Sequence, residues 1–239
     1  TLGASYFDYI VADEIVIPRE HEPFYVEKIS WLPECYQSND DKRPIAAVPP
    51  TRAQAGLPDD AFVFCCFNNS YKFTPATFDT WMRILGQVPN SVLWILESNK
   101  ALAPNLKHEA EARGVSGDRI VFAPFVKPEE HLARQRLADL FLDSLPYNAH
   151  TTAADALWGG LPLLTCTGSA FPGRVATSLL TALHLPELIT RSTEEFEKTA
   201  ITLAQDKSRL AAIRAKLAEN RTRAPLFNTA RFTRHIESA

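Results

Sequence analysis

The sequence lacks the patterns that mark several common classes of protein. Its four cysteines form no CxxC pair and have no histidine at zinc-ligand spacing, so neither a metal site nor a disulfide framework is indicated. No apolar run reaches the roughly 18 residues of a membrane-spanning helix, and no charged and apolar leader opens the sequence. The formal net charge of -3 comes without the basic stripe that binds nucleic acid. We therefore expect a cytoplasmic protein with neither a membrane nor a nucleic-acid partner.

The composition that remains is that of an ordinary globular protein. Hydrophobic residues make up 46% of the chain and charged residues 22%, which excludes both disorder and a fibrous class. A length of 239 residues suits one complete α/β unit with an appendage. The sequence opens at Thr1 and runs straight into strand-like residues. We therefore expect it to be part of a longer protein whose N-terminal portion is missing.

Strand and helix patterns divide the chain into two parts. Two short strands are expected at residues 6–12 and 26–32, and a proline-studded linker at residues 33–60 follows them. Beyond the linker, short β-branched or aromatic runs alternate with helical patterns, which predicts a doubly wound parallel sheet. Its strands are predicted at residues 62–67, 91–96, 119–123, 138–142 and 162–165, with helices at 75–88, 105–113, 129–137, 152–158, 173–183, 193–205, 207–221 and 228–238.

Ligands of such sheets bind beyond the carboxyl ends of the strands, and three loops there carry suitable side chains. In the first loop, Lys72 precedes Thr74 and Pro75, which have the types expected at a helix N-cap and first position. The helix dipole disfavours a cation there unless an anion joins it. The alternative is a solvated surface lysine. No GxGxxG or P-loop pattern accompanies it, which argues against a dinucleotide or ATP cradle.

The other two loops offer a heterocycle site and an anion site. His131 and Arg134 lie three residues apart on one helix face, where they can hold a flat ring, although exposed helix residues are the simpler interpretation. His150, Thr151 and Thr152 open a later helix, whose free N–H groups and hydroxyls suit a diphosphate. Two local alternatives remain open: capping of that helix through the spacing of Thr152 and Asp155, and a loop histidine bonded to its own backbone.

Several of these segments together resemble the O-GlcNAc transferase family. The resemblance rests on Phe67-Asn-Asn-Ser-Tyr-Lys72, Glu129-Glu-His131, His150-Thr-Thr, Ala156-Leu-Trp158 and Pro225-Leu-Phe-Asn-Thr229, in the same order over roughly residues 1–239. It implies an inverting, metal-independent and cofactor-free GT-B glycosyltransferase that moves N-acetylglucosamine from UDP-GlcNAc to serine or threonine hydroxyls of proteins. The fold it implies is the C-terminal, Rossmann-like α/β lobe, together with a few strands left from the other lobe.

The resemblance also implies a role for each site residue. Lys72 would be catalytic, meeting the donor diphosphate and stabilising the leaving UDP. The remaining family positions would bind the UDP-sugar. His131 and Arg134 would hold the uridine, Asp155 would accept from the ribose, and the diphosphate would be bound by His150, Thr151 and Thr152. Tyr71 and Asn69 belong to the active-site loop that faces the donor. Asn69 stands where animal enzymes have glutamine. Lys127 is displaced by one position from the family's nucleotide-contacting lysine and is kept only as a tentative contact.

The same resemblance predicts what lies outside this chain. Residues 1–45 would be a remnant of the N-terminal catalytic lobe with its linker, and residues 46–239 the nucleotide-sugar-binding lobe. The missing lobe would supply most of the acceptor groove and follow tetratricopeptide repeats that recruit protein substrates, so the isolated chain is expected to be inactive. Two alternatives stay open. They are a protein O-fucosyltransferase using GDP-fucose, against which His150 argues, and a non-catalytic nucleotide-sugar-binding scaffold.

Overall fold

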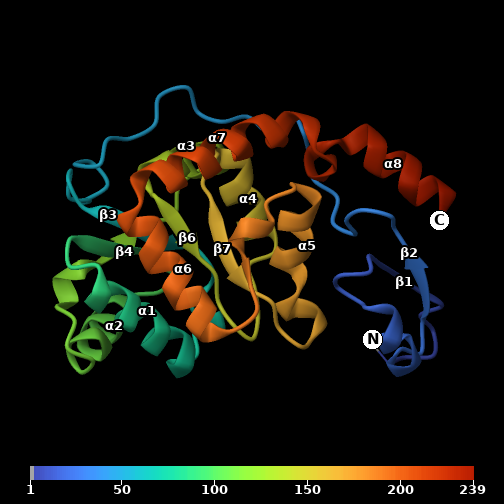
Figure 1. Cartoon of the computed structure of the whole chain (residues 1–239), viewed down its shortest axis with the longest axis horizontal. Helices are drawn as coiled ribbons and strands as arrows, with labels where there is room; N and C mark the ends of the chain where they lie inside the picture. The colour runs from blue at the N-terminus through green and yellow to red at the C-terminus, as the bar shows by residue number, and fades with distance from the viewer. Residues whose placement is uncertain (1–2) are drawn as a thin grey trace.

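A six-stranded parallel sheet organises the chain in a computed structural model that describes residues 3–239 (Figure 1). The strand order is β5-β4-β3-β6-β7-β8, so the order reverses between β3 and β6. This confirms the predicted doubly wound sheet. The strands are β3 (Phe62–Cys66), β4 (Ser91–Leu96), β5 (Ile120–Ala123), β6 (Leu140–Leu142), β7 (Leu163–Cys166) and β8 (Ile189–Thr190).

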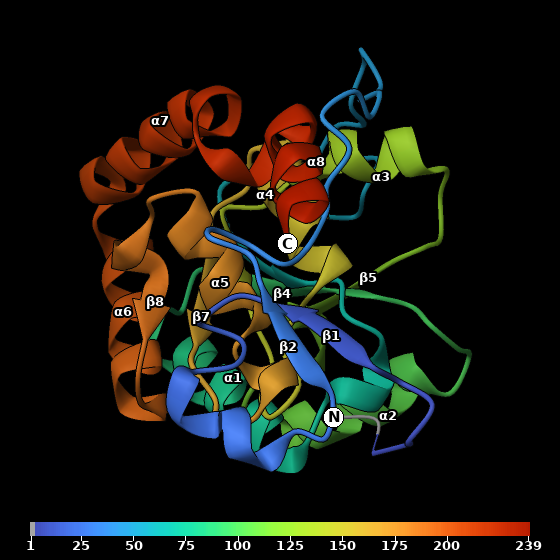
Figure 2. The same ribbon diagram turned by 90° about the vertical axis from the view of Figure 1, so that its right-hand side faces the viewer.

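Helices cover both faces of this sheet. One layer holds α1 (Pro75–Gln87), α2 (Leu102–Glu111) and α6 (Thr193–Gln205), and the other holds α3 (Pro128–Arg134), α4 (Thr151–Gly159) and α5 (Val175–Ala182) (Figures 1 and 2). All residues of β6 and β7 are buried, as expected of strands that are covered on both sides. The chain ends in α7 (Lys207–Arg223) and α8 (Thr229–Ser238). None of the helices in residues 3–239 combines the length and apolar character that crossing a bilayer requires.

The structure corrects some predicted boundaries. The two-residue strand β8 was not predicted, because so short a run carries no alternation. Helix α2 begins at Leu102, three residues before the predicted start. The helix predicted to end at residue 137 ends at Arg134 and continues as a 3₁₀ turn, so β6 begins at Leu140 rather than at 138.

The N-terminal strands form a separate pair that is docked on the main unit. β1 (Tyr9–Ala12) and β2 (Lys28–Trp31) pair in parallel and lie beside α5 (Figure 2). Asp13, which is buried at the end of β1, accepts hydrogen bonds from Ser178 Oγ of α5 at 2.6 Å and from Tyr36 N at 2.9 Å. Arg174 donates to Val16 O at 3.0 Å. These polar contacts fix the segment against α5, and Val16 joins the core of the main unit.

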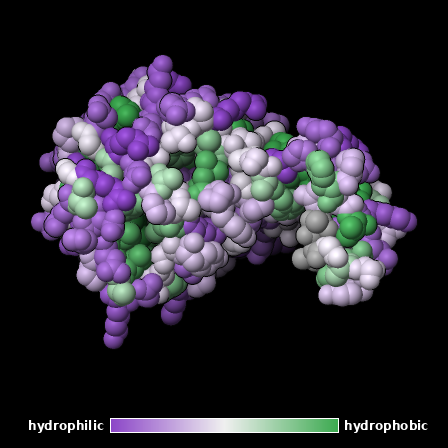
Figure 3. All heavy atoms as spheres, turned by 90° about the horizontal axis from the view of Figure 1, so that it is seen from below, coloured by the Kyte–Doolittle hydropathy of each residue, from purple (hydrophilic) through white to green (hydrophobic). Residues whose placement is uncertain are grey.

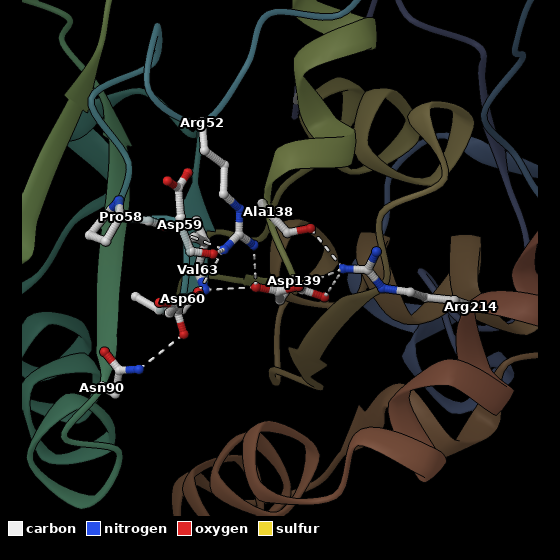
Figure 4. Close-up of polar contacts among 10 residues, drawn as sticks. Arg52, Pro58, Asp59, Asp60, Val63, Asn90, Ala138, Asp139 and Arg214 are labelled. Atoms are coloured by element: carbon white, nitrogen blue, oxygen red, sulfur yellow. Dashed lines mark hydrogen bonds and ion pairs between the residues drawn. The ribbon is translucent and has the colours of Figure 1, made fainter.

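The linker contains neither helix nor strand over residues 33–60, as predicted, and it is tied to the amino edge of the sheet. Asp139 stands just before β6 (Figure 4). Its Oδ2 accepts from Arg52 of the linker at 2.9 Å and from Val63 N of β3 at 2.8 Å, and its Oδ1 accepts from Arg214 of α7 at 3.1 Å. One carboxylate thus joins the linker, the sheet and the last long helix.

We predict that Asp139→Ala lowers the free energy of unfolding by about 2 kcal/mol, because it leaves a strand N–H without its acceptor and removes one acceptor from each of two guanidinium groups. Urea denaturation of the purified protein measures this. The control is Glu219→Ala, which removes the exposed pair with Arg223 and is expected to change stability by less than about 0.5 kcal/mol. Equal effects of the two substitutions would contradict the role given to Asp139.

Candidate functional site

The reversal of strand order places two of the predicted loops against each other. Residues 67–74 follow β3 and residues 143–150 follow β6, its neighbour in the sheet. Lys72 Nζ, from the first loop, donates to Asn148 O of the second at 2.8 Å and lies 4.1 Å from the centre of the Tyr147 ring. Figure 3 views the molecule from the side on which these strands end, with the N-terminal segment at the right. A crevice at such a reversal point is where open α/β sheets bind ligands.

Lys72 is buried, so the interpretation as a solvated surface lysine is wrong. Only 9% of the residue is exposed, and burial lowers the pKa of its ammonium group. It ends the 3₁₀ helix Ser70–Lys72, directly before α1, which Thr74 caps by accepting from Thr77 N. None of the ion pairs within residues 3–239 includes Lys72. Its positive charge is therefore partly desolvated and has no carboxylate in direct contact, which suits an anionic ligand.

Asp143 organises the second loop, and sequence reasoning gave it no role. Its carboxylate accepts from Ser144 N at 2.8 Å, Ala149 N at 2.6 Å and Thr165 Oγ1 of β7 at 2.6 Å. Asn68 Nδ2, beyond β3, lies 3.5 Å from it and donates to Ser144 Oγ. Burial raises the pKa of Asp143 to about 6. The signal in the sequence was a charged residue placed directly after an apolar strand.

The start of α4 is uncapped by side chains, as an anion site requires. The helix begins at Thr151, His150 occupies the N-cap position, and its side chain makes no capping hydrogen bond. The capping-box alternative is wrong, because the Asp155 carboxylate pairs with Arg43 at 2.5 Å instead of with the backbone. Thr151 is exposed and Thr152 is half-buried, and within residues 3–239 neither hydroxyl has a hydrogen-bond partner. Their N–H groups and hydroxyls are therefore available to an anion.

His150 is held in a defined orientation rather than bonded to its own backbone. Its Nε2 lies 3.1 Å from Pro172 O, and its ring stacks on Tyr147 with centroids 4.7 Å apart. Burial lowers the pKa of this imidazole, so it is neutral at pH 7. Because a carbonyl oxygen only accepts, Nε2 carries the proton and Nδ1 remains an acceptor.

Arg134 and His131 are also more buried than exposed helix residues would be. Arg134 is 4% exposed and donates to Pro124 O at 2.6 Å and, through Nη2, to His131 Nδ1 at 2.7 Å. Since a guanidinium only donates, Nδ1 of His131 accepts and the proton of the neutral ring lies on Nε2. The Gln135 amide, whose nitrogen lies 3.1 Å from Nε2, then turns its oxygen toward that proton. Burial, together with Arg134, lowers the pKa of His131 to about 4. The imidazole ring lies 5.2 Å from that of Phe67, at the end of β3.

The remaining predicted residues lie at the surface of the same loops. Asn69 and Tyr71 flank Ser70 in the loop that carries Lys72, and Tyr71 is 75% exposed. Lys127 is exposed at the N-cap of α3. In residues 3–239 no three His, Cys, Asp or Glu side chains lie close enough to share a metal ion, and all four cysteines are buried and free. The site therefore offers a lysine, a helix N-terminus and two neutral histidines.

The raised pKa of Asp143 makes a prediction about pH. A carboxyl whose folded pKa of about 6 exceeds its ordinary value of 3.8 keeps the proton in the folded state over a pH range in which the unfolded chain has lost it. Wild-type stability relative to Asp143→Asn should therefore decrease by about 3 kcal/mol as the pH rises from 4 to 7. Denaturant unfolding across this range measures it. The exposed carboxyl variant Asp118→Asn should differ from wild type by less than about 0.5 kcal/mol throughout. A pH-independent difference for Asp143→Asn would refute the assignment.

Comparison with known proteins gives a consistent family. Glycosyl transferase family 41 matches residues 37–236. A protein of Arabidopsis thaliana, described as a probable UDP-N-acetylglucosamine–peptide N-acetylglucosaminyltransferase SEC, is 41% identical over 243 residues, which cover 99% of this chain and 25% of that protein. The UDP-N-acetylglucosamine–peptide N-acetylglucosaminyltransferase of Caenorhabditis elegans is 41% identical over 187 residues, covering 78% of this chain and 16% of its own length. The chain thus spans about a quarter or less of these relatives.

Solved structures agree with the fold. A lysine-to-methionine mutant of the O-GlcNAc transferase of Thermobaculum terrenum superposes with a TM-score of 0.87 at 29% identity, covering 97% of this chain and 44% of that one. Sucrose-phosphate synthase from Thermosynechococcus elongatus, at 16% identity and a TM-score of 0.68 over 96% of this chain and 57% of that one, shares the fold alone. These matches confirm the predicted Rossmann-like lobe. The chain belongs to glycosyl transferase family 41.

Proposed function

We propose that this chain is the donor-binding catalytic lobe of an inverting transferase that moves N-acetylglucosamine from UDP-GlcNAc to protein serine or threonine hydroxyls. The observation that carries the proposal is the pairing of Lys72, buried and without a carboxylate partner, with the uncapped start of α4 across the reversal point of the sheet. Two relatives at 41% identity are named for this activity.

The proposed chemistry is stabilisation of a departing diphosphate. The N–H groups and hydroxyls of Thr151 and Thr152 bind phosphate oxygens, and the helix dipole adds a partial positive charge at that point. As the bond to the sugar breaks, negative charge grows on the leaving UDP, and the ammonium group of Lys72 offsets it. The lysine is already partly desolvated, so little reorganisation is required when the charge develops. The proposal uses neither a metal nor a cofactor.

At the nucleoside end, the proposal uses groups that are held in one protonation state. His131 is neutral, and Arg134 and Gln135 engage its two ring nitrogens, so the orientation of the imidazole ring beside a bound uracil is fixed. Asp155, one turn into α4, is the carboxylate proposed to accept from the ribose hydroxyls. Asn69 and Tyr71 are proposed to contact the donor from the Lys72 loop.

The N-terminal segment is proposed to belong with a second lobe that lies outside this chain. Tyr6, Tyr9, Phe24 and Val26 are each more than 60% exposed, and apolar side chains gather at this end of the molecule (Figure 3). We propose residues 1–45 as the remnant of that lobe with its linker, and residues 46–239 as the donor-binding lobe. The second lobe would complete the acceptor side, and tetratricopeptide repeats would recruit acceptor proteins. The isolated chain would then bind donor without transferring sugar.

The central test replaces the lysine in the full-length protein that carries this chain. Lys72→Met should reduce sugar transfer about 10²- to 10³-fold, the usual effect of removing one group that stabilises developing charge. UDP affinity, measured by calorimetry, should weaken by less than about tenfold, because the contacts of α4 remain. The control is Lys100→Met, an exposed lysine, which should leave both quantities unchanged. Transfer by Lys72→Met at the wild-type rate would refute the catalytic role. Absence of transfer by the wild type would favour the scaffold alternative.

Nucleotide preference tests the choice of donor. We expect the protein to bind UDP at least about tenfold more tightly than GDP, because the two relatives at 41% identity are named for UDP-N-acetylglucosamine and uracil and guanine present different hydrogen-bonding edges to a binding site. Competition calorimetry with the two nucleotides measures the ratio. A preference for GDP would instead support the O-fucosyltransferase alternative.

A further inference from the structure

Arg43 belongs to the linker, yet its side chain reaches the proposed donor site. The backbone around it is tied down independently. Thr229 Oγ1 donates to Asn39 O at 2.9 Å, Trp158 Nε1 donates to Arg43 O at 3.1 Å, and Ala46 N donates to Glu129 O at 3.0 Å. These bonds hold residues 39–46 against α8, α4 and α3. The Arg43 side chain is therefore not needed to keep the linker in place.

Among residues 3–239, that side chain makes a single ion pair, with Asp155. Arg43 Nη1 lies 2.5 Å from Asp155 Oδ1, and the two side chains are only 28% and 16% exposed. Its positive charge also contributes to the lowered pKa of His131, and the linker backbone beside it is bonded to α3 through Glu129 O. Three elements that are distant in the sequence, the linker, α3 and α4, thus each contribute one side chain to the same small region.

The pairing leaves one carboxylate oxygen of Asp155 available. Within residues 3–239, Oδ2 has no hydrogen-bond partner, and Arg43 is the single partner of Oδ1. The torsion that rotates an aspartate carboxylate is broad, so without Arg43 the structure contains no contact that fixes its orientation. The arrangement holds one carboxylate oxygen of Asp155 and leaves the other available to a ligand.

We propose that Arg43 is a positioning residue of the donor site, which orients Asp155 so that its free oxygen accepts from the ribose hydroxyls. This proposal rests on the proposed function, because it takes a nucleoside diphosphate as the ligand. The linker is then part of nucleoside recognition, in addition to connecting the N-terminal strands with the main unit. Arg43 itself need not touch the nucleotide.

The test compares UDP with 2′,3′-dideoxy-UDP by calorimetry on the full-length protein. Wild type should bind UDP about tenfold more tightly, the usual effect of hydrogen bonds to a charged acceptor. Arg43→Met should reduce this ratio to below about threefold by weakening UDP alone, and Asp155→Asn should do the same. Arg43→Lys should restore part of the ratio, because the ammonium group can still pair with Oδ1.

The matched control is Arg52→Met, which removes another linker arginine, bonded to Asp139 at the amino edge of the sheet. It should lower stability yet keep the tenfold ratio. A ratio that stays tenfold in Arg43→Met would overturn the positioning role and leave the ion pair as a structural tie. Wild-type protein that binds neither nucleotide would overturn the proposed function as well, so the two failures are distinguishable.

Discussion

The buried carboxylate of Asp143 is the contact on which the geometry of the site depends. It lies where β6 ends. Its oxygens accept hydrogen bonds from two backbone N–H groups of its own loop and from Thr165 of β7, and Asn68, just beyond β3, lies close by. Burying a carboxylate is costly unless donors surround it. These donors lie on both sides of the reversal point. Because the carboxylate needs all of these hydrogen bonds, they fix the conformation of the loop that offers Asn148 O to Lys72 and places His150 before α4.

The site holds two features that an anion would stabilise, a partly desolvated cation and the uncapped start of a helix. Desolvation lowers the pKa of Lys72 and raises that of Asp143, which means that burial outweighs the attraction between the two groups. The first N–H groups of α4 are also left without side-chain caps. A diphosphate would lie near the cation and at the positive end of the helix dipole at once. Preorganised charge of this kind favours the state in which the ligand carries the most negative charge, and in the proposed sugar transfer that state is the departing UDP.

The features of the fold and the site that depend on local sequence patterns could be predicted from the sequence. Apolar runs such as residues 62–66 predicted the buried strands, and the position of Lys72 ahead of Thr74 and Pro75 predicted a cation before a helix. Contacts between distant residues could not be predicted in this way. The spacing of Thr152 and Asp155 indicated a capping box, but the partner of Asp155 is Arg43, 112 residues away in the sequence. Asp143 was overlooked because its donors lie in its own loop, in β7 and just beyond β3, and only the fold brings these segments together.

The linker is fixed to the fold more firmly than its composition alone indicates. Its prolines and polar residues predicted a connection without regular structure, and that is correct. Yet two of its arginines make partly buried ion pairs, Arg52 with Asp139 beside the first residues of the sheet and Arg43 with Asp155 on α4. Asp13 makes a comparable contact from the end of β1 to α5. Irregular backbone that is held by charged side chains at several points behaves as a fixed part of the fold. The N-terminal strands are therefore held in a definite position relative to the proposed donor site, and a lobe built on those strands would be held in the same way.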